Sequence, residues 1–414
     1  MKVLVMGAGV VGVTTAWQLL EDGHEVTVVE RFAEAADETS FGNAGAIAPG
    51  HAYAWSSPRA PMTLLRSLWR NDQALRFRFS LDPKLWSWSL KFLGQCSAER
   101  YRRNTQIKHR LCTYSKSVLH DVTDQTGIEY DRRAGGILYI YRSPDAFEKR
   151  IEEMAILTDL GEELRALQPD EVIATEPALA SARGKIAGAI HAAGDETGDC
   201  RKFTQALAAL AVEGGATFKY NTSVTDIVTV GDQVDKVLTD KGEERADAYV
   251  MAMGCDSPRF SKPLGVDLPI YPIKGYSVTL PIAGRNNPPS INGIDEENLT
   301  AFTRMGDRFR VTATAEFAGY DKSHQPSDYT RMLSSIRDLL PEAADFDAPS
   351  YWAGLRPMTP DNCPYLGAGK QKNLFYNTGH GHIGWTMSNG SARIVTDLIA
   401  GRQPAIDLDG LAVR

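Results

Sequence analysis

The sequence predicts an α/β and α+β protein made of two parts: a dinucleotide-binding domain that is discontinuous along the chain, and a second domain with a mixed or antiparallel sheet. Three observations predict this class. A glycine-rich turn joins a short apolar strand to a helix at the amino terminus. Alternating apolar and polar residues mark strands over 271–282 and 300–321. A second glycine-rich turn leads into a helix over 377–401.

The amino terminus carries the pattern of a Rossmann-like dinucleotide site. Residues 2–6 are apolar and rich in β-branched side chains, which is typical of a buried parallel strand. "GAGVVG" at 7–12 follows, then a segment with helical spacing, and then a second strand over 25–30 that ends in Glu30. The order strand, GxGxxG, helix, strand and acid is the complete fingerprint.

Each glycine of this fingerprint has a physical reason. Gly7 makes the tight turn, and Gly9 lets the backbone approach a pyrophosphate. Gly12 allows the helix to pack closely on the strand. The alternative to a dinucleotide site is a glycine-rich turn in an ordinary α/β domain.

The residues around the glycines complete the predicted nucleotide contacts. Val10 and Val11 lie at the helix amino terminus, where unpaired N–H groups and the helix dipole favour phosphate. Glu30 is expected to accept hydrogen bonds from ribose hydroxyls, and it disfavours a cofactor with a 2′-phosphate. Arg31, its neighbour, is a further candidate contact. This fingerprint leaves NAD and FAD open.

The bulk composition excludes several classes of function. A net charge of −7 argues against nucleic acid as a partner, because phosphate binding needs clustered Lys and Arg. The five cysteines form no CxxC pair and no His/Cys ligand spacing, which indicates reduced thiols in a cytoplasmic protein and no structural metal. No window of about 18 uncharged apolar residues predicts a transmembrane helix.

The segment after the acid favours FAD. An NAD domain normally continues from its second strand into a crossover helix, whereas here small residues and glycines follow over 37–50. This stretch resembles the FAD-dependent amine oxidoreductases of the D-amino-acid oxidase superfamily, in which it lies along the FAD pyrophosphate and the flavin. A flexible surface loop is the alternative. The resemblance falls on Thr39, Ser40, Asn43, Ala44 and Gly45.

The same resemblance extends to two later segments. Val224 falls where the superfamily contacts adenine through the backbone, and the strand end that contains Ala252 and Gly254 resembles the one that returns to the pyrophosphate. The resemblance therefore implies a Rossmann-like FAD-binding domain interrupted by a substrate domain with a helical cap. The expected FAD-binding pieces are 1–50, 196–265 and 345–414, and the expected substrate pieces are 51–195 and 266–344.

The helical part of the substrate domain leaves two interpretations open. Residues 60–120 are rich in Trp and Arg and predict helices. Trp69, Trp86 and Trp88 are expected to pack a helical cap rather than to stack on bases. The alternative is an amphipathic surface that contacts a membrane peripherally.

Arg356 is the strongest candidate for a catalytic residue. It lies in "YWAGLRPMTPDNCPYLG", residues 351–367, whose Gly and Pro content predicts a loop. A guanidinium cannot lose its proton and matches a carboxylate with two parallel hydrogen bonds. The segment resembles the superfamily motif in which an arginine binds the α-carboxylate of the amino acid. The alternative is an arginine bonded to loop carbonyls or to Asp361.

Tyr276 and Lys274 are weaker candidates for the substrate site. Tyr276 is expected either to line this site or to pack in the core, and Lys274 either to approach flavin N5 through a water or to form a surface ion pair. Residues 310–316 lack glycines that relatives carry on this strand, which leaves the shape of the pocket open.

The carboxyl-terminal glycine-rich turn is expected at the pyrimidine end of the flavin. In the superfamily a helix amino terminus points there, and its N–H groups and dipole stabilise negative charge on the reduced flavin. His380 and His382 are two residues apart in a glycine-rich loop, which is not a recurrent metal-ligand spacing. The candidate residues are Gly381, His382, Ile383, Gly384, Trp385 and Thr386.

Fragments along nearly the whole chain, among them "GVVGV", "GLRPMTPD" and "NTGHGHIGWTM", together resemble most closely the bacterial D-amino-acid dehydrogenases of the small-subunit type. This implies oxidative deamination of D-amino acids or cyclic imino acids by hydride transfer from Cα to flavin N5. It also implies a quinone or other electron acceptor and a cytoplasmic location, with peripheral contact at the inner membrane left open. Three alternatives remain: a proline-type or cis-4-hydroxy-D-proline dehydrogenase, a flavin-binding assembly protein, and an NAD dehydrogenase.

Overall fold

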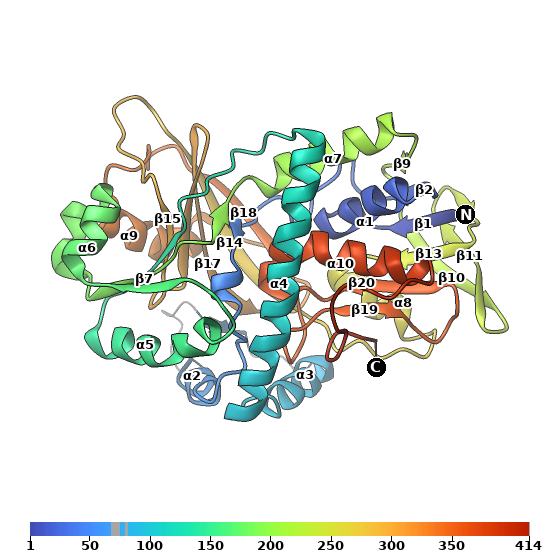
Figure 1. The fold of residues 1–414 in the computed structure, drawn as a ribbon, viewed down its shortest axis with the longest axis horizontal. Helices are drawn as coiled ribbons and strands as arrows, with labels where there is room; N and C mark the ends of the chain where they lie inside the picture. The colour runs from blue at the N-terminus through green and yellow to red at the C-terminus, as the bar shows by residue number, and fades with distance from the viewer. Residues whose placement is uncertain (68–74, 79–81, 414) are drawn as a thin grey trace.

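Two β-sheets lie side by side in the computed structural model, which describes residues 1–67, 75–78 and 82–413. Figure 1 shows the first sheet on the right and the second on the left, with the long helix α4 (Ala98–Thr126) running between them. The chain crosses between the two sheets several times, so each sheet is assembled from segments far apart in sequence.

The first sheet has six strands in the order β19-β20-β13-β1-β2-β9. It is parallel except for the edge strand β19, and the apolar run of β1 pairs with β2 on one side and β13 on the other. Alternate side chains of β1 pack into separate cores on the two faces of the sheet, which explains its continuous apolar sequence. The strands are β1 (Lys2–Met6), β2 (Glu25–Val29), β9 (Thr217–Lys219), β13 (Ala248–Met251), β19 (Tyr365–Ala368) and β20 (Leu374–Thr378).

Helices cover one face of this sheet and a β-meander covers the other. Helices α1, α7 and α10 pack with α4 around one large apolar core, whereas Leu4, Met6 and Met251 point into a separate core beneath the meander. The resulting three layers are typical of a Rossmann-like nucleotide-binding domain. The elements are α1 (Val10–Glu21), α7 (Cys200–Glu213), α10 (Gly384–Ile399), β10 (Val224–Val230), β11 (Gln233–Thr239) and β12 (Gly242–Glu244).

The second sheet is mixed, and most of its pairs are antiparallel. Its main path runs β18-β14-β17-β16-β15-β5-β7-β6, with β4 paired to β17. Only the pairs β15–β5 and β17–β4 are parallel. The strands are β4 (Leu75–Phe77), β5 (Ile137–Tyr141), β6 (Leu164–Leu167), β7 (Gly188–Ala192), β14 (Tyr271–Pro281), β15 (Asn292–Asp295), β16 (Thr300–Met305), β17 (Arg308–Phe317) and β18 (Ser350–Met358).

The remaining elements connect and cover the two sheets. Helices α2 and α3 lie at the lower edge of Figure 1, and α5, α6 and α9 surround the second sheet. They are α2 (Ala60–Ser67), α3 (Pro83–Leu93), α5 (Pro144–Thr158), α6 (Pro169–Thr175), α8 (Ser257–Ser261) and α9 (Thr330–Leu339). The short pieces are β3 (Ala46–Ile47), β8 (Glu196–Thr197), η1 (Pro49–His51), η2 (Pro177–Lys185), η3 (Gly254–Asp256), η4 (Pro326–Tyr329) and η5 (Gly381–Ile383).

The predicted fold class is confirmed, but two elements pack with the other domain from the one in which they were expected. Strand β18 follows residue 345 and was expected with the FAD-binding part, yet it pairs along its length with β14 of the second sheet. Helix α4 lies within the expected substrate piece 51–195, yet it packs on α10. Its buried side chains, Leu111 and Leu119 among them, belong to the core of the first domain. A long amphipathic helix between two domains shares its apolar face with whichever core is adjacent, and sequence order does not determine which.

The two described tryptophans of the predicted helical cap differ in exposure. Trp88 is 4% exposed and packs on Phe92, whereas Trp86 is 51% exposed. Trp69 lies outside the described residues. Among the helices that the structure describes, none is long and apolar enough to cross a membrane.

Candidate functional site

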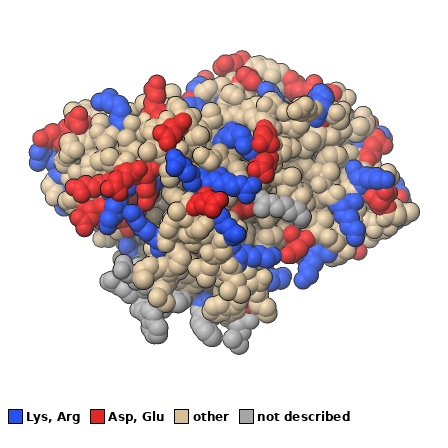
Figure 2. Space-filling view, turned by 60° about the horizontal axis from the view of Figure 1, so that its bottom comes forward, with Lys and Arg blue, Asp and Glu red and all other residues tan. Residues whose placement is uncertain are grey.

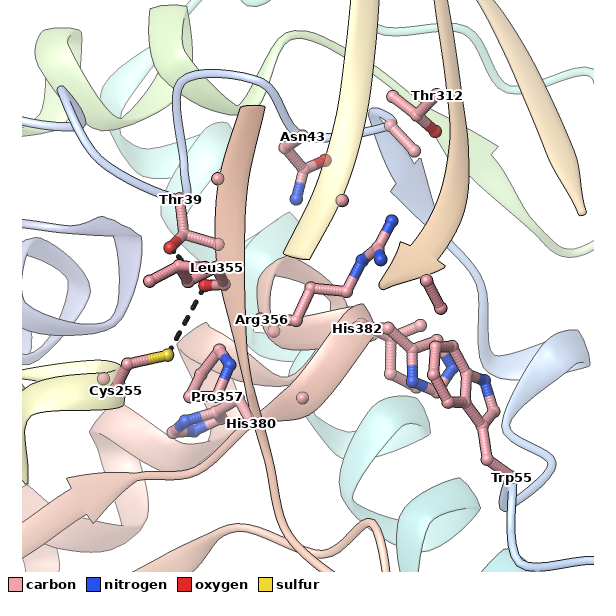
Figure 3. Close-up of a pocket in the computed structure, with 18 of the residues that line it drawn as sticks. Thr39, Asn43, Trp55, Cys255, Thr312, Leu355, Arg356, Pro357, His380 and His382 are labelled. Carbon is pink, nitrogen blue, oxygen red and sulfur yellow. Dashed lines mark hydrogen bonds between the residues drawn. The ribbon is translucent and has the colours of Figure 1, made fainter. Parts of the chain in front are cut away.

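A single cavity of about 1370 Å³ connects the glycine-rich turn of the first sheet with strand β18 of the second. Pockets for drug-sized ligands enclose about 300–1,000 Å³, so this cavity has room for a large ligand and a small one together. Figure 3 shows Arg356 extending into it, with Thr312 on one side and His382 and Trp55 on the other.

The glycine-rich turn has the geometry that its sequence predicts. Gly7 has a φ of +104°, and a Cβ there would lie 2.7 Å from the carbonyl oxygen of Ala252. A Cβ on Gly12 would lie 1.9 Å from the carbonyl oxygen of Gly7, so only glycine lets α1 pack this closely on the turn. Gly9 has open space by comparison, since its Cβ would meet only Ser40 Oγ at 3.6 Å.

Two helix amino termini open into this cavity. The residues before α1 and α10, Gly9 and Ile383, provide no side-chain cap, and both helices begin in the cavity wall. The N–H of Val10 donates to Ser40 Oγ at 3.1 Å. The remaining first-turn N–H groups and the two helix dipoles favour anionic or acceptor groups of a ligand.

Glu30 lies at the end of β2 and borders the cavity together with the glycine-rich turn. These residues and the amino terminus of α1 are called here the dinucleotide cradle. The two carboxylate oxygens of Glu30 accept from the N–H groups of Ala8 at 2.6 Å and Phe32 at 3.0 Å. Burial raises the pKa of the Glu30 carboxyl, although these hydrogen bonds and the nearby Arg31 oppose the shift. Further hydroxyl donors from a ribose would stabilise the ionised carboxylate.

Arg31 spans the rim of the cavity instead of reaching into its depth. Its guanidinium forms ion pairs with Asp256 at 2.6 Å and Glu38 at 3.1 Å. Burial would lower the pKa of Arg31, but the charges of Asp256 and Glu38 raise it overall. Arg31 therefore joins the segment after β2 to the η3 turn after β13.

The segment that resembles the FAD-binding loop crosses from the first sheet to the second. Thr39 Oγ1 donates to the carbonyl oxygen of Leu355, next to Arg356, at 2.7 Å, and Asn43 Oδ1 accepts from the N–H of Gly45 at 2.6 Å. These hydrogen bonds hold the segment against the cavity wall, which argues against the alternative of a flexible surface loop.

Most of the predicted cofactor residues line the cavity, and three do not. Gly12, Gly45 and Thr386 lie behind the wall, where Gly12 packs α1 on the turn and Thr386 Oγ1 donates to the carbonyl oxygen of Ala46 at 3.2 Å. Those that line the wall are Gly7, Gly9, Val10, Val11, Glu30, Arg31, Thr39, Ser40, Asn43, Ala44, Val224, Ala252, Gly254, Gly381, His382, Ile383, Gly384 and Trp385.

Arg356 lies on a strand, and the prediction of a loop is wrong. Residues Ser350–Met358 pair in antiparallel register with β14, in which Pro357 lies opposite Pro272. Because β18 is the edge strand of the sheet, a proline that donates no hydrogen bond is tolerated there. The guanidinium donates to the carbonyl oxygen of Thr314 at 2.9 Å, and burial lowers the pKa of Arg356 to about 10.

A bulge in β17 aims the Thr314 carbonyl at Arg356. The pairing of β14 with β17 shifts by one residue between Lys274 and Tyr276, and Thr314 has a φ of +66°. Glycine is the usual residue for this conformation, and a β-branched residue there is strained. The absence of glycines over 310–316 therefore does not remove the bulge, and Thr314 is a site residue that sequence reasoning missed.

The structure places Lys274 and Tyr276 away from Arg356. Gly275 between them faces Arg356, since a Cβ on Gly275 would lie 2.5 Å from the guanidinium carbon. Side chains alternate along a strand, so those of Lys274 and Tyr276 project to the other face of β14. Tyr276 borders the cavity but belongs to the buried core beneath it, as in the core-packing alternative.

These two side chains share a buried carboxylate. Tyr276 donates its hydroxyl hydrogen to Glu316, and the Lys274 ammonium lies 3.9 Å from the same carboxylate and donates to the Ser323 carbonyl. Burial, together with Glu316, raises the pKa of the Tyr276 hydroxyl. Lys274 is 0% exposed, so its ion pair with Glu316 is buried and the expectation of a surface ion pair is corrected. Its approach to flavin N5 through a water stays a prediction.

His382 forms the wall opposite Arg356. Its ring stacks on Trp55 with 4.6 Å between ring centroids. Burial, together with the charges of Lys108, His51 and Arg356, lowers the pKa of His382 well below its usual range. His382 is therefore neutral at physiological pH and adds no positive charge beside Arg356.

Several wall residues carried no signal in the sequence. His51, Tyr53, Arg150 and Glu296 line the cavity from three separate segments, and no motif connects them.

The described part of the chain contains no group of three or more His, Cys, Asp and Glu side chains that could hold a metal ion.

A dinucleotide cradle that shares its cavity with a buried arginine defines the class of a nucleotide-dependent oxidoreductase with a separate substrate sheet. The family model described as FAD dependent oxidoreductase matches residues 2–398. The chain belongs to this family, and its cofactor is FAD.

The names of individual relatives are consistent with membership of this family. The chain is 45% identical over 414 residues to D-amino acid dehydrogenase of Paramagnetospirillum magneticum, covering 100% of this chain and 98% of the relative. It is 44% identical over 412 residues to D-amino acid dehydrogenase 2 of Mesorhizobium japonicum, covering 99% of each. The crystal structure of glycine oxidase from Geobacillus kaustophilus has the same fold, with a TM-score of 0.77, 22% identity and coverage of 100% of this chain and 98% of that one.

Proposed function

We propose that the protein catalyses the FAD-dependent oxidative deamination of D-amino acids to 2-oxo acids and ammonia. The observation that carries the proposal is the position of Arg356, a buried cation in the same cavity as the dinucleotide cradle. No carboxylate in the described part of the chain forms an ion pair with it, and one backbone carbonyl is its hydrogen-bond acceptor. The names of the relatives support D-amino acids as the substrate class.

The geometry assigns the protein a positioning role. Arg356 would hold the α-carboxylate with two parallel hydrogen bonds and so fix the orientation of Cα. Neutral His382 and the Trp55 ring would exclude water from the same region. When bound along the cradle, FAD supplies the hydride acceptor at N5. The imino acid that forms when Cα loses its hydride is hydrolysed by water, and no protein base is needed once the amine is neutral.

The cradle residues would each hold one part of FAD. The amino terminus of α1 would bind the pyrophosphate, Glu30 the ribose hydroxyls and the backbone near Val224 the adenine. The amino terminus of α10 would stabilise the negative charge that develops at the pyrimidine end.

The substrate class is tested by the visible spectrum of the anaerobic holoenzyme. We expect D-alanine to bleach the flavin and L-alanine to leave it oxidised. Bleaching by D-proline and cis-4-hydroxy-D-proline alone would replace this assignment with the ring-amine alternative. A flavin that none of the four compounds bleaches would favour the flavin-binding assembly protein.

The ribose role of Glu30 gives a separate prediction. Replacing Glu30 with alanine removes the acceptor at the end of β2, and we expect FAD to dissociate on dialysis while the wild type retains it. The measurement is the ratio of flavin to protein absorbance before and after dialysis. Full flavin occupancy of Glu30→Ala would contradict the role, and Glu34→Ala, on the exposed side of the same loop, serves as the control.

The proposal for the electron acceptor is based on the protein surface beside the cavity. Thr63 and Leu64 of α2 and Trp88 and Phe92 of α3 line the cavity, while other side chains of the same helices face solvent. Figure 2 brings this edge forward and shows few charged side chains on it. The exposed apolar side chains are Met62 at 53%, Leu65 at 53%, Trp86 at 51%, Leu90 at 70% and Leu93 at 42%.

We infer that this exposed face of α2 and α3 makes peripheral contact with the inner membrane and admits a quinone acceptor from it. Apolar side chains on a short amphipathic pair of helices enter the boundary between headgroups and acyl chains. A cytoplasmic enzyme held in this way would pass its electrons to the respiratory chain.

A vesicle-binding measurement tests the membrane contact. Replacing Leu90 with glutamate places a charge on the proposed face, and we expect about tenfold weaker binding to vesicles of phosphatidylethanolamine and phosphatidylglycerol. The matched control is Val230→Glu, because Val230 is 69% exposed on the meander of the other domain. Equal vesicle binding by the Leu90 variant and the wild type would contradict the contact.

A further inference from the structure

A second set of polar side chains lines the cavity beyond Arg356. It consists of His51, Tyr53, Arg150 and Glu296, which are called here the polar wall. His51 Nε2 lies 2.8 Å from Glu296 Oε1, and the Arg150 guanidinium lies over the Tyr53 ring at 4.4 Å from its centroid. The wall therefore presents a carboxylate, a guanidinium, an imidazole and a phenol within one region.

The polar groups of the wall are paired with one another or with Glu153, but the pairs are poorly aligned. Tyr53 Oη, Glu296 Oε1, His51 Nε2 and Arg150 Nη1 are buried and make no aligned hydrogen bond. Tyr53 is 6% exposed. A ligand group that offers these atoms better-aligned hydrogen bonds would therefore be stabilised at the wall.

Groups of opposite charge alternate in this region. Arg59 lies 3.2 Å from Glu153, Glu153 lies 3.4 Å from Arg150, and the charge of Arg150 acts on Glu296. Burial alone would raise the pKa of Glu296, but the charges of His51 and Arg150 lower it overall, so the carboxylate is ionised. A cation entering the region would be attracted by Glu296 but repelled by Arg150, and an anion the reverse, so either charge gains little net attraction. A neutral group with both a donor and an acceptor satisfies both residues.

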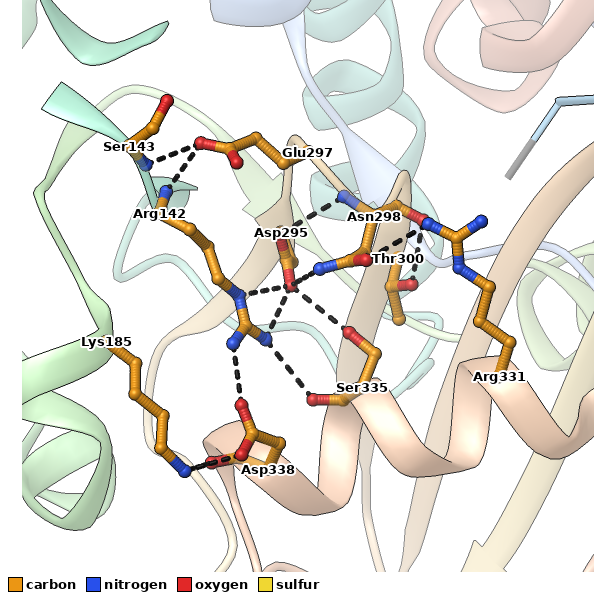
Figure 4. A network of polar contacts seen from close by, with 10 residues as sticks. All are labelled: Arg142, Ser143, Lys185, Asp295, Glu297, Asn298, Thr300, Arg331, Ser335 and Asp338. Atoms are coloured by element: carbon orange, nitrogen blue, oxygen red, sulfur yellow. Dashed lines mark hydrogen bonds and ion pairs between the residues drawn. The ribbon is translucent and has the colours of Figure 1, made fainter. Parts of the chain in front are cut away.

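Glu296 is held in place by a network outside the cavity. The preceding residue, Asp295, is 0% exposed, and its carboxylate accepts from Arg142 Nε at 2.9 Å and from Asn298 Nδ2 at 2.8 Å (Figure 4). Arg142 also donates to Asp338 of α9 at 2.7 Å. This network fixes the turn that carries Glu296 and so orients its side chain toward the cavity.

Buried neighbouring groups also fix the position of His51. Asp195 accepts from the N–H of Gly50 at 2.8 Å and from the Tyr139 hydroxyl at 2.6 Å, and the Tyr139 ring stacks on His51 at 4.5 Å between centroids. The polar wall is therefore rigid on both sides.

The polar wall and Arg356 face the same ligand space. Arg356, His382 and the polar wall line the same cavity, and Trp55, two residues after Tyr53, stacks on His382 with 4.6 Å between ring centroids. An amino acid whose carboxylate binds Arg356 can therefore extend its side chain along His382 toward the polar wall.

We propose that the polar wall is the subsite for the substrate side chain and that it selects neutral side chains with both a donor and an acceptor, of which carboxamides are the example. This specificity rests on the proposed D-amino-acid oxidation. Glu296 accepts from the amide NH₂, and Arg150 and Tyr53 donate to the amide oxygen.

Isosteric substrates test this specificity in the holoenzyme. D-asparagine, D-aspartate and D-leucine have side chains of nearly equal shape that are neutral polar, anionic and apolar. We expect kcat/KM with an artificial electron acceptor to be highest for D-asparagine, by about tenfold over each of the others. D-glutamine and D-glutamate extend the comparison by one methylene. No preference for either amide over its acid and over D-leucine would overturn the proposal.

Two variants connect the preference to the polar wall. Glu296→Gln removes the charge of the acceptor, and Tyr53→Phe removes one donor while keeping the ring beneath Arg150. Each is expected to lower the ratio of kcat/KM for D-asparagine to that for D-leucine by about tenfold. The matched control is Glu297→Gln on the same turn, whose carboxylate accepts from the N–H groups of Arg142 and Ser143 and should leave this ratio unchanged. Unchanged ratios in both wall variants would overturn the proposal.

A binding measurement separates this proposal from the proposed function. Succinamate and 4-methylpentanoate are the carboxylates of asparagine and leucine without the amine, so neither can be oxidised. Calorimetry with the oxidised holoenzyme is expected to give a Kd about tenfold lower for succinamate than for 4-methylpentanoate, and the two values should converge in Glu296→Gln. Equal affinities in the wild type would overturn the subsite. If D-alanine also fails to reduce the flavin, the proposed function fails with it; if D-alanine reduces the flavin, only the subsite fails.

Discussion

Replacing Arg356 with alanine is expected to raise KM for D-alanine by roughly 100-fold to 10,000-fold. Two charge-assisted hydrogen bonds to a carboxylate contribute about 1.5–3 kcal/mol each, and every 1.4 kcal/mol is about tenfold in affinity. The loss should be near the upper end because Arg356 is buried, so water cannot replace it efficiently. Steady-state kinetics over a wide range of D-alanine concentrations measures the effect.

The FAD content separates loss of the carboxylate contact from general damage. Arg356 lies on β18 of the second sheet, away from the glycine turn, so the Arg356→Ala variant should retain its flavin. Arg356→Lys keeps the charge but lacks the two-pronged geometry, and it should recover only part of the affinity. Unchanged KM in the alanine variant would show that another group binds the carboxylate.

Replacing Gly12 with alanine is expected to destabilise the protein by about 3 kcal/mol or more and to abolish FAD retention. The added Cβ would lie 1.9 Å from the carbonyl oxygen of Gly7, which belongs to backbone that cannot rotate away. Overpacking of this kind commonly costs about 1–3 kcal/mol even where side chains can adjust. Thermal unfolding of the cofactor-free protein measures the first effect, and flavin absorbance measures the second.

Gly9 provides the matched control for Gly12. An added Cβ at Gly9 would meet only Ser40 Oγ at 3.6 Å, which is an ordinary contact, and the φ of Gly9 is −69°. The Gly9→Ala variant should therefore unfold at the wild-type temperature without cofactor, yet bind FAD more weakly because its Cβ faces the proposed pyrophosphate. A Gly12→Ala variant as stable as Gly9→Ala would contradict the close packing of α1.

The parts of the site that the sequence predicts are those encoded by local spacing. The glycine turn, Glu30 and the amino terminus of α10 each depend on neighbours within a few residues, so the pattern determines their place. Arg356 was identified by its residue type and motif, but its strand was missed because Gly and Pro predict a loop. The pairing with β14 that overrides this preference is a tertiary interaction.

Residues that depend on strand orientation or long-range assembly could not be predicted in the same way. Lys274 and Tyr276 lie on the cavity's strand but on its other face, and a strand's sequence alone does not say which face meets a ligand. The polar wall joins η1, α5 and the turn after β15, which are far apart in the chain. Their proximity follows from the packing of the second sheet and left no local pattern.

Product stoichiometry in a single anaerobic turnover tests the central claim most directly. The holoenzyme would be mixed with excess D-alanine without an electron acceptor, and the reduced flavin, pyruvate and ammonia would be quantified after quenching. We expect one pyruvate and one ammonia for each flavin reduced in the wild type, and far slower reduction at the same D-alanine concentration in Arg356→Ala. Flavin that stays oxidised, or that is reduced without forming pyruvate and ammonia, would contradict it.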